Sequence, residues 1–203
     1  MNTQTASANA LKTKLLAAVA SILLCAGAHA SNLVTNGDFE TGDFTGWTTQ
    51  AAGAGSESEE SLFGVDGNGP HNGSYSAYFG ATAPYDTISQ TIATTAGQSY
   101  TISFYLDSEG TQGGAAGFIG SFGGTTFVSL NGSDADRSFG EETVTVQATS
   151  ASTVLSFGAY DTSSYYTLDD VNVSAVPEPS SLGLFSLGVL GLGLLRRKSR
   201  RAD

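Results

Sequence analysis

The chain has 203 residues, of which 40% are hydrophobic, 13% are charged and 26 are glycine, so its composition favours strands and turns over helices. From Ser31 to Val176 it holds seventeen acidic residues and one base, Arg137; this net charge of −16 repels nucleic-acid phosphates and excludes DNA and RNA as partners. The only cysteine, Cys25, lies near the N-terminus, so the rest of the chain offers neither a disulfide nor a thiolate metal site.

The first 30 residues have the three parts of a secretory signal peptide. Lys12 and Lys14 supply positive charge, residues 15–28 form an apolar stretch, and Ala28-His29-Ala30 is an A-x-A cleavage motif. We therefore expect a signal helix over residues 1–30 that is cleaved off, which leaves Ser31 as the first residue of the mature protein. The alternative, a transmembrane helix, needs about 20 apolar residues, and this stretch is shorter.

Residues 31–175 are predicted to form one β-rich ectodomain. Runs of alternating apolar and polar residues are separated by glycine-rich segments, at 64–73 and 113–117, that are predicted to be turns. In the clearest run, 98–107, one face carries Tyr100, Ile102, Phe104 and Leu106. The other predicted strands are 47–51, 74–79, 87–92, 125–130, 143–147, 153–160 and 165–173. About eight or nine short strands predict an all-β fold, an antiparallel β-sandwich.

Four segments of this domain form a recognisable signature. They are NLVTNGDFETGDFTGW (32–47), GSYSAYFG (73–80), ISQTIATTAGQSYTISFYL (88–106) and YYTLDDVNV (165–173). Together they resemble the galactose-binding-like jelly-roll superfamily, which includes many carbohydrate-binding modules. The resemblance implies a jelly roll, but it implies no particular ligand, because function depends on the site and not on the fold.

The last predicted strand contains a carboxylate that needs a partner. If Val171 and Val173 point into the core, alternation places Asp169 on the same side. An unpaired carboxylate buried there costs several kcal/mol. A bound Ca²⁺ would neutralise it, since this ion takes six to eight oxygen ligands.

The resembling modules often hold such an ion between their first and last strands. Position by position, this implies Glu40 and Asp169 as side-chain ligands, with backbone carbonyls near Asp38 and Gly42 completing the shell. We therefore expect a structural calcium site. The alternative is that Asp38 and Asp43 cap turns and that Asp169 faces solvent after a β-bulge.

Sugar sites combine exposed aromatic faces with polar side chains. Four tyrosines are candidate glycan ligands on this basis: Tyr85, Tyr105, Tyr160 and Tyr165. Trp47, which follows a glycine of the signature, is predicted to lie in the core.

No pattern typical of an enzyme is present in residues 31–175. Their one histidine, His71, lies in a Gly/Pro-rich segment, where a turn residue is the simpler interpretation than a catalytic base. A glycosidase needs two carboxylates at a defined separation, and none of the seventeen acids stands out as half of such a pair. We predict that the domain is not an enzyme.

The C-terminus, residues 176–203, has three parts in a fixed order. Val176-Pro177-Glu178-Pro179 is followed by an apolar run over 180–195 and a basic tail, 196–203. The two prolines exclude a helix at the motif. The apolar run forms a short transmembrane helix if flanking arginines snorkel, and the basic tail belongs on the cytoplasmic side. The acidic domain then lies outside.

This tail resembles the PEP-CTERM sorting signal of exopolysaccharide-producing Gram-negative bacteria. The resemblance implies that an exosortase recognises Pro177-Glu178-Pro179, and the alternative is an ordinary single-span anchor. We expect an exported, non-catalytic surface or matrix protein associated with exopolysaccharide. It would be held for a time in the inner membrane, facing the periplasm, and then reach the cell surface. Alternative functions are a carbohydrate-binding module and a glycan-active hydrolase.

Overall fold

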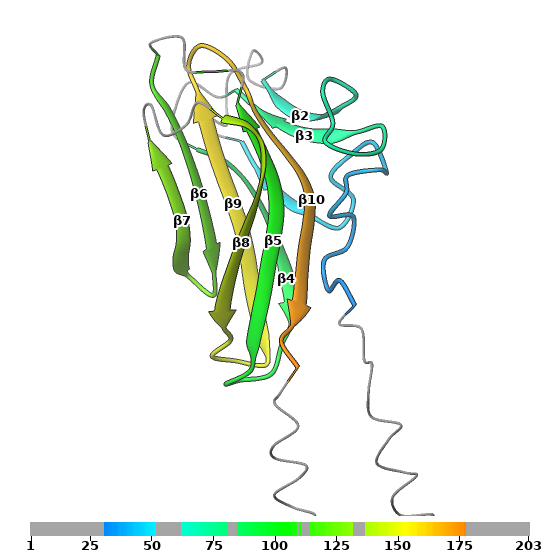
Figure 1. The fold of residues 1–203 in the computed structure, drawn as a ribbon, viewed down its shortest axis with the longest axis vertical. Coiled ribbons are helices and arrows are strands. Elements are labelled where there is room, and N and C mark those ends of the chain that lie inside the picture. The colour runs from blue at the N-terminus through cyan, green and yellow to red at the C-terminus, as the bar shows by residue number, and fades with distance from the viewer. Residues whose placement is uncertain are drawn as a thin grey trace, which may run out of the picture. The chain divides into compact units, whose positions relative to one another are not determined.

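The structure is a computed structural model and describes residues 31–51, 62–80, 85–108, 110, 114–131 and 137–177. These residues contain ten β-strands and no helix, and they form two antiparallel sheets packed face to face (Figure 1). The predicted all-β antiparallel sandwich is confirmed. The predicted signal helix and C-terminal span lie outside the described residues. Within the described ranges, no helix is long and apolar enough to cross a membrane.

Each sheet has five strands. Sheet A contains, in spatial order, β1 (Thr48–Gln50), β4 (Asp86–Ala93), β9 (Ser152–Asp161), β6 (Ala116–Phe122) and β7 (Thr125–Asn131). Sheet B contains β2 (Phe63–Asp66), β3 (Ser76–Phe79), β10 (Tyr166–Ala175), β5 (Ser99–Ser108) and β8 (Arg137–Gln147). The consecutive strands β9 and β10 belong to different sheets, so the chain crosses between the layers at residues 162–165.

Alternating apolar side chains from both sheets fill the space between the layers. The four inward residues predicted for β5 are at most 3% exposed, as are their neighbours Leu155, Phe157 and Ala159 on β9. The ring centroids of Phe104 and Phe157 lie 5.1 Å apart across the two layers. Trp47 is also buried, as predicted, and donates its indole N–H to the Asn36 carbonyl at 3.0 Å. Local alternation therefore predicted the buried faces of β5 and β9 correctly.

Strand β2 lies where the sequence predicts a turn, and β6 begins within the other predicted turn and continues through residues that were not assigned to a strand. Both contain glycines that leave room for an aromatic ring from a neighbouring strand. A Cβ on Gly117 would lie 2.6 Å from the Tyr160 ring, and one on Gly120 would lie 2.6 Å from the Phe127 ring. Glycine is needed here for close packing between strands, and such tertiary contacts are invisible to local turn propensity.

A β-bulge reverses the side-chain directions within β10. Asp170 has a φ of 50°, and the register with β5 shifts beyond Asp169. Leu168 before the bulge and Val171 after it are both buried in the core, so Asp169 points to the outer face of sheet B. The predicted parity of Asp169 is wrong because the bulge adds a residue to this strand. Asp169 is nevertheless 0% exposed, since residues 71–72 cover it.

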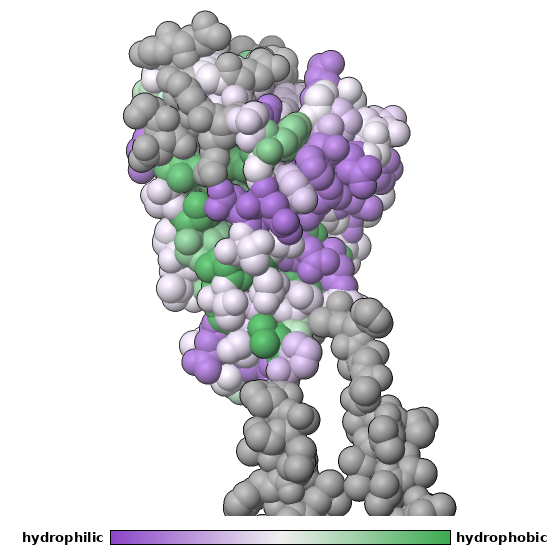
Figure 2. Space-filling view, in the orientation of Figure 1, coloured by the Kyte–Doolittle hydropathy of each residue, from purple (hydrophilic) through white to green (hydrophobic). Residues whose placement is uncertain are grey.

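The opening segment of the domain lies along β10. The Leu33 amide donates to the Val173 carbonyl, and the Val171 amide donates to the Gly37 carbonyl, both at 2.8 Å. Hydrophilic side chains gather over the part of the surface formed by this segment with β2 and β3 (Figure 2). The two ends of the signature sequence therefore meet on one polar side of the sandwich.

Candidate functional site

The four candidate tyrosines lie on two opposite surfaces of the sandwich. Tyr85 and Tyr160 lie on the outer face of sheet A, where Tyr160 pairs with Gly117. Tyr105 and Tyr165 lie on the side of sheet B. The structure therefore brings together only two of the four as a ring pair.

Tyr85 and Tyr160 form an edge-to-face pair, with ring centroids 5.0 Å apart and an interplanar angle of 80°. Both rings use the space that Gly117 leaves, since a Cβ there would lie 2.9 Å from the Tyr85 hydroxyl oxygen. Both residues are half-buried. Burial raises the pKa of the Tyr85 phenol, whose hydroxyl can donate and accept hydrogen bonds at neutral pH like that of any tyrosine. The pair is thus a fixed aromatic surface with polar tips.

Small polar side chains continue this surface along sheet A. Thr87 pairs with Gly158 in the next row of the sheet. One row further, Ser89 of β4, Ser156 of β9 and Ser121 of β6 are register partners on three adjacent strands. The outer face therefore presents aromatic rings beside a row of hydroxyl groups.

Tyr105 is covered by the imidazole of His71. The two rings stack with centroids 3.5 Å apart and an interplanar angle of 13°. His71 Nδ1 also lies 2.8 Å from the Asp170 carboxylate. One face of Tyr105 is therefore occupied within the protein by His71, which lies at the surface beside Asp170.

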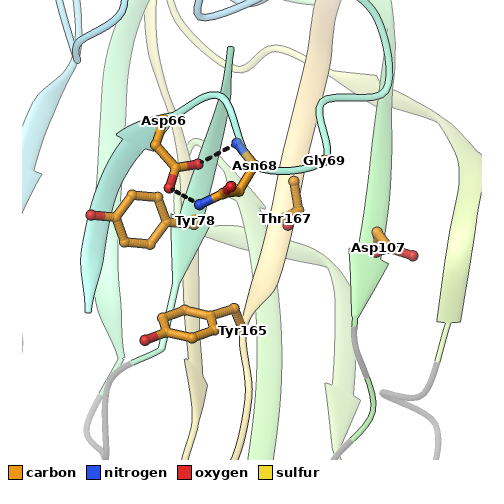
Figure 3. A pocket seen from close by; sticks show the side chains of 7 residues that line it. All are labelled: Asp66, Asn68, Gly69, Tyr78, Asp107, Tyr165 and Thr167. Carbon is orange, nitrogen blue, oxygen red and sulfur yellow. Dashed lines mark hydrogen bonds between the residues drawn. The ribbon is translucent and has the colours of Figure 1, made fainter. Parts of the chain in front are cut away.

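A hollow of about 530 Å³ lies on the outer face of sheet B (Figure 3). Thr167 of β10 lies between its register partners, Tyr78 of β3 and Asp107 of β5. The rings of Tyr78 and Tyr165 meet edge to face, with centroids 5.9 Å apart. The lining is completed by Asp66, Asn68 and Gly69. Of these residues, the sequence analysis singled out only Tyr165.

The remaining lining residues could be found only in part from sequence. Alternation within 74–79 places Tyr78 opposite the buried Ala77 and Phe79, which indicates an outward ring. The approach of Asp66 and Asn68 depends on strand β2, which the sequence predicts as a turn. Asp66 is held by Asn68, whose backbone N–H and side-chain amide donate to its two oxygens, each at 2.9 Å.

The two carboxylates predicted to bind calcium hold the segment 71–75 at its two ends. Glu40 Oε1 accepts the amides of Ser74 and Tyr75 at 2.6 and 2.9 Å. Asp169 accepts the amides of His71 and Asn72 through Oδ2, at 2.9 and 3.2 Å. Its Oδ1 accepts the amide of Asp170 at 2.7 Å. Burial raises the pKa of Asp169 to about 6, although these hydrogen bonds oppose the shift.

The other predicted calcium ligands lie in the turns of the opening segment. Asp38 Oδ1 is 3.5 Å from the Glu40 amide, and Gly42 has a φ of 74°. Asp43 caps a turn by accepting the Thr45 amide at 2.9 Å, as the alternative interpretation expected. Across the described ranges, no three His, Cys, Asp or Glu side chains gather as a metal site. A calcium ion here would need backbone oxygens beside Glu40 and Asp169, and the site stays a prediction.

The predicted sorting motif begins directly after β10. The Val176 amide donates to the Ser99 carbonyl at 2.9 Å, and its carbonyl accepts the side-chain amide of Gln98 at 2.6 Å. Pro177 is the last described residue. Glu178 and Pro179 lie outside the described residues, as do Ala28 and Ala30 of the signal cleavage site.

Residues 175–200 match the PEP-CTERM protein-sorting motif. The chain carries a PEP-CTERM sorting signal. Such a signal indicates a protein that is exported, anchored in a membrane and then processed, and it implies that the processing enzyme is an exosortase. Residues 31–115 match the carbohydrate binding domain. No curated protein matches the chain.

Solved structures similar to the PEP-CTERM chain share its fold at low identity. A carbohydrate-binding module, TmCBM61 in complex with β-1,4-galactotriose, aligns at 16% identity and a TM-score of 0.52, over 72% of this chain and 100% of that chain. The CBM22-1 xylan-binding domain of Paenibacillus barcinonensis Xyn10C aligns at 17% identity and a TM-score of 0.53, over 76% of this chain and 100% of that chain. A cyclase from Fischerella sp. TAU aligns at 17% identity and a TM-score of 0.52, over 74% of this chain and 100% of that chain. This fold therefore serves both binding and chemistry.

Proposed function

We propose that the PEP-CTERM protein is an exported surface protein that binds an extracellular glycan without acting on it chemically. The observation that carries this proposal is the Tyr85–Tyr160 pair on the outer face of sheet A. These are the two predicted glycan ligands that the fold brings together, and the carbohydrate binding domain match to residues 31–115 supports the same ligand class.

The chemistry of this face suits a sugar. The apolar face of a sugar ring packs against an aromatic ring, while its hydroxyl groups need hydrogen-bond partners. Tyr85 and Tyr160 supply the rings, and the serine row at Ser89, Ser156 and Ser121 supplies hydroxyl groups.

The same face favours binding over hydrolysis. A glycosidase places two carboxylates on either side of the bond that it cleaves. The carboxylates next to the tyrosines in sequence, Asp86 and Asp161, are each 1% exposed and point into the interior. In the rows of Tyr160 and Gly158, the outward register partners on the described strands carry no carboxylate; they are Gly117, Asn131, Thr87, Ile119 and Ser129. If the domain were a hydrolase, the bound glycan would be cleaved, and an assay of turnover would detect this.

The position of the sorting signal agrees with a role outside the cell. Its motif begins directly after β10, so processing there would release the whole sandwich from its anchor. We propose that the domain first faces the periplasm and is then delivered to the exopolysaccharide at the cell surface.

The test is a glycan array followed by titration, using the full chain in detergent. Tyr85→Ala and Tyr160→Ala should each weaken binding about fivefold, since one aromatic contact is worth on the order of 1 kcal/mol. Val154→Ala is the matched control, because Val154 lies outward on the same strand, is 47% exposed and is distant in register from the pair. Unchanged affinity in both tyrosine variants would contradict the proposed site, and turnover of the glycan would favour the hydrolase.

A further inference from the structure

We propose that the hollow on sheet B is a second glycan site, selective for sugars without acidic groups, so that one domain can bridge two glycan strands. This inference takes only its ligand class from the proposed function. The residues that carry it are Tyr78, Tyr165, Asp66, Asn68 and Asp107.

The two candidate sites face away from each other. Tyr160 projects outward from sheet A, and Tyr78 projects outward from sheet B. The core lies between them, as the contact of Phe104 with Phe157 shows. Packed sheets are about 10 Å apart, and the outward side chains add to this separation. A ligand in the hollow therefore lies on the opposite side of the sandwich from one on sheet A.

The rings of the hollow, like those of sheet A, pack against glycines of neighbouring segments. A Cβ on Gly64 would lie 2.6 Å from the Tyr78 hydroxyl oxygen, and one on Gly80 would lie 2.5 Å from the Tyr165 ring. Each tyrosine therefore lies directly against the backbone of a glycine. The edge-to-face contact between the two rings, with centroids 5.9 Å apart, fixes them further. A ligand would meet aromatic surfaces that need little rearrangement.

The hollow has the size and the polar groups of a ligand site. Its volume of about 530 Å³ lies within the range of about 300–1,000 Å³ that is usual for small-molecule sites. Its two rings lie beside side chains that can hydrogen-bond, with Asp66 and Asn68 on one side and Asp107 on the other (Figure 3). A sugar needs this combination of an aromatic surface and flanking polar groups.

Charge decides which sugars the hollow accepts. Its lining includes the carboxylate of Asp66, and the segment from Ser31 to Val176 carries a net charge of −16. Each Asp66 oxygen accepts one hydrogen bond from Asn68 and keeps lone pairs for another donor. Hydroxyl and ammonium groups can supply that donor, whereas a uronic acid would bring a like charge. The ligand is therefore a neutral or amine-bearing sugar.

Two sites on opposite faces give the domain a function that one site cannot provide. A bivalent protein links two polymer strands, and its second binding event benefits from a raised effective concentration. A matrix protein of this kind would cross-link exopolysaccharide instead of only adhering to it.

The first experiment counts ligands. The full chain in detergent is titrated calorimetrically with neutral hexasaccharides (cellohexaose, xylohexaose and β-1,4-galactohexaose), a chitosan hexamer and an oligogalacturonate. We expect two bound oligosaccharides per chain for a neutral or amine-bearing probe, and no binding of the oligogalacturonate in the hollow. Tyr78→Ala and, independently, Gly64→Ala should reduce the number from two to one. Thr101→Ala, an outward residue of sheet B outside the hollow, should leave it at two.

The outcomes separate this inference from the proposed function. One ligand per chain that is lost only in Tyr85→Ala would overturn the second site and leave the proposed function standing. One ligand lost only in Tyr78→Ala would overturn bridging and the sheet A site together. Melting curves for every variant identify any that does not fold, and Gly64→Ala tests the hollow without removing a ring.

The second experiment measures cross-linking and charge selectivity. The wild-type chain should increase the scattering of a neutral polysaccharide that binds both sites, whereas Tyr78→Ala and Tyr85→Ala should each abolish the increase. Asp66→Asn should raise the affinity of the hollow for the oligogalacturonate at least several-fold. Cross-linking that survives in both tyrosine variants, or an Asp66→Asn hollow that still rejects the oligogalacturonate as strongly as wild type, would contradict the inference.

Discussion

The outer faces of the two sheets use tyrosine and glycine in the same way but differ in charge. On sheet A, the Tyr85–Tyr160 pair lies against Gly117 and adjoins neutral hydroxyl groups. On sheet B, Tyr78 lies against Gly64 and adjoins two aspartates. Sheet B also holds the buried Asp169 beneath the segment 71–72. The difference teaches that ring placement comes from glycine on a neighbouring strand, whereas ligand preference comes from the polar residues around it.

The largest effect is expected from a substitution in the core, which both outer faces share. Phe104→Ala deletes a ring that lies between the layers and contacts Phe157. It should lower the free energy of unfolding by about 3–5 kcal/mol, since a cavity replaces buried aromatic surface. Chemical denaturation measures the change, and Tyr75→Ala, at a residue that is 39% exposed, is the control. A loss below about 1 kcal/mol would show that the faces do not depend on a common core.

The second-largest effect comes from Asp169, the buried carboxyl group of sheet B. Asp169 has a pKa raised to about 6, whereas an unfolded aspartate titrates near 3.9. The folded protein therefore binds more protons between these two values, and its stability should fall by roughly 3 kcal/mol as the pH rises from about 4 to above 6.

Denaturation at several pH values in the presence of a chelator measures this loss. Asp169→Asn has no carboxyl group to titrate, so its stability should change less over the same interval. Because His71 Nδ1 lies 2.8 Å from the Asp170 carboxylate, beside Asp169, His71→Gln is measured in parallel as a control for this contact. Parallel curves for wild type and Asp169→Asn would contradict the prediction.

Calcium should reverse that pH dependence if the predicted site binds it. A bound ion stabilises the folded state by about 2.7 kcal/mol at a concentration one hundred times the Kd, and it would lower the pKa of Asp169. Glu40→Gln and Asp169→Asn should both abolish the rise in melting temperature on addition of calcium. A melting temperature that is the same with calcium and with chelator would contradict the predicted calcium site.

The smallest effect is expected from a substitution of Gly117, the glycine beneath the tyrosine pair of sheet A. Gly117→Ala places a Cβ 2.6 Å from the Tyr160 ring, so the Tyr85–Tyr160 pair must move. Glycan affinity of that face should fall several-fold, equivalent to about 1 kcal/mol, while the hollow keeps its affinity. Titration of the Tyr78→Ala background isolates the sheet A site for this measurement. An equal loss at both faces would indicate that Gly117 acts through the core.

Much of the fold could be predicted from the sequence, because the alternation of apolar and polar residues is a local property. The run 98–107 predicted the buried side of β5, and 153–160 predicted that of β9. Strands β2 and β6 were not predicted, because Gly64, Gly117 and Gly120 make room for rings of neighbouring strands and do not form turns. Of the candidate glycan ligands, residue type was enough to single out the tyrosines. It was not enough to show that His71 covers Tyr105.

The sequence by itself determined the acidic charge of the domain, the alternation of its main strands and the sorting signal at its end, because each is a property of consecutive residues. Tertiary structure alone decided that Tyr85 meets Tyr160, that Tyr78 joins Tyr165, and that the bulge at Asp170 turns Asp169 outward under a covering segment. These arrangements depend on strand register and on the approach of residues far apart in the chain, which a one-residue bulge is enough to change.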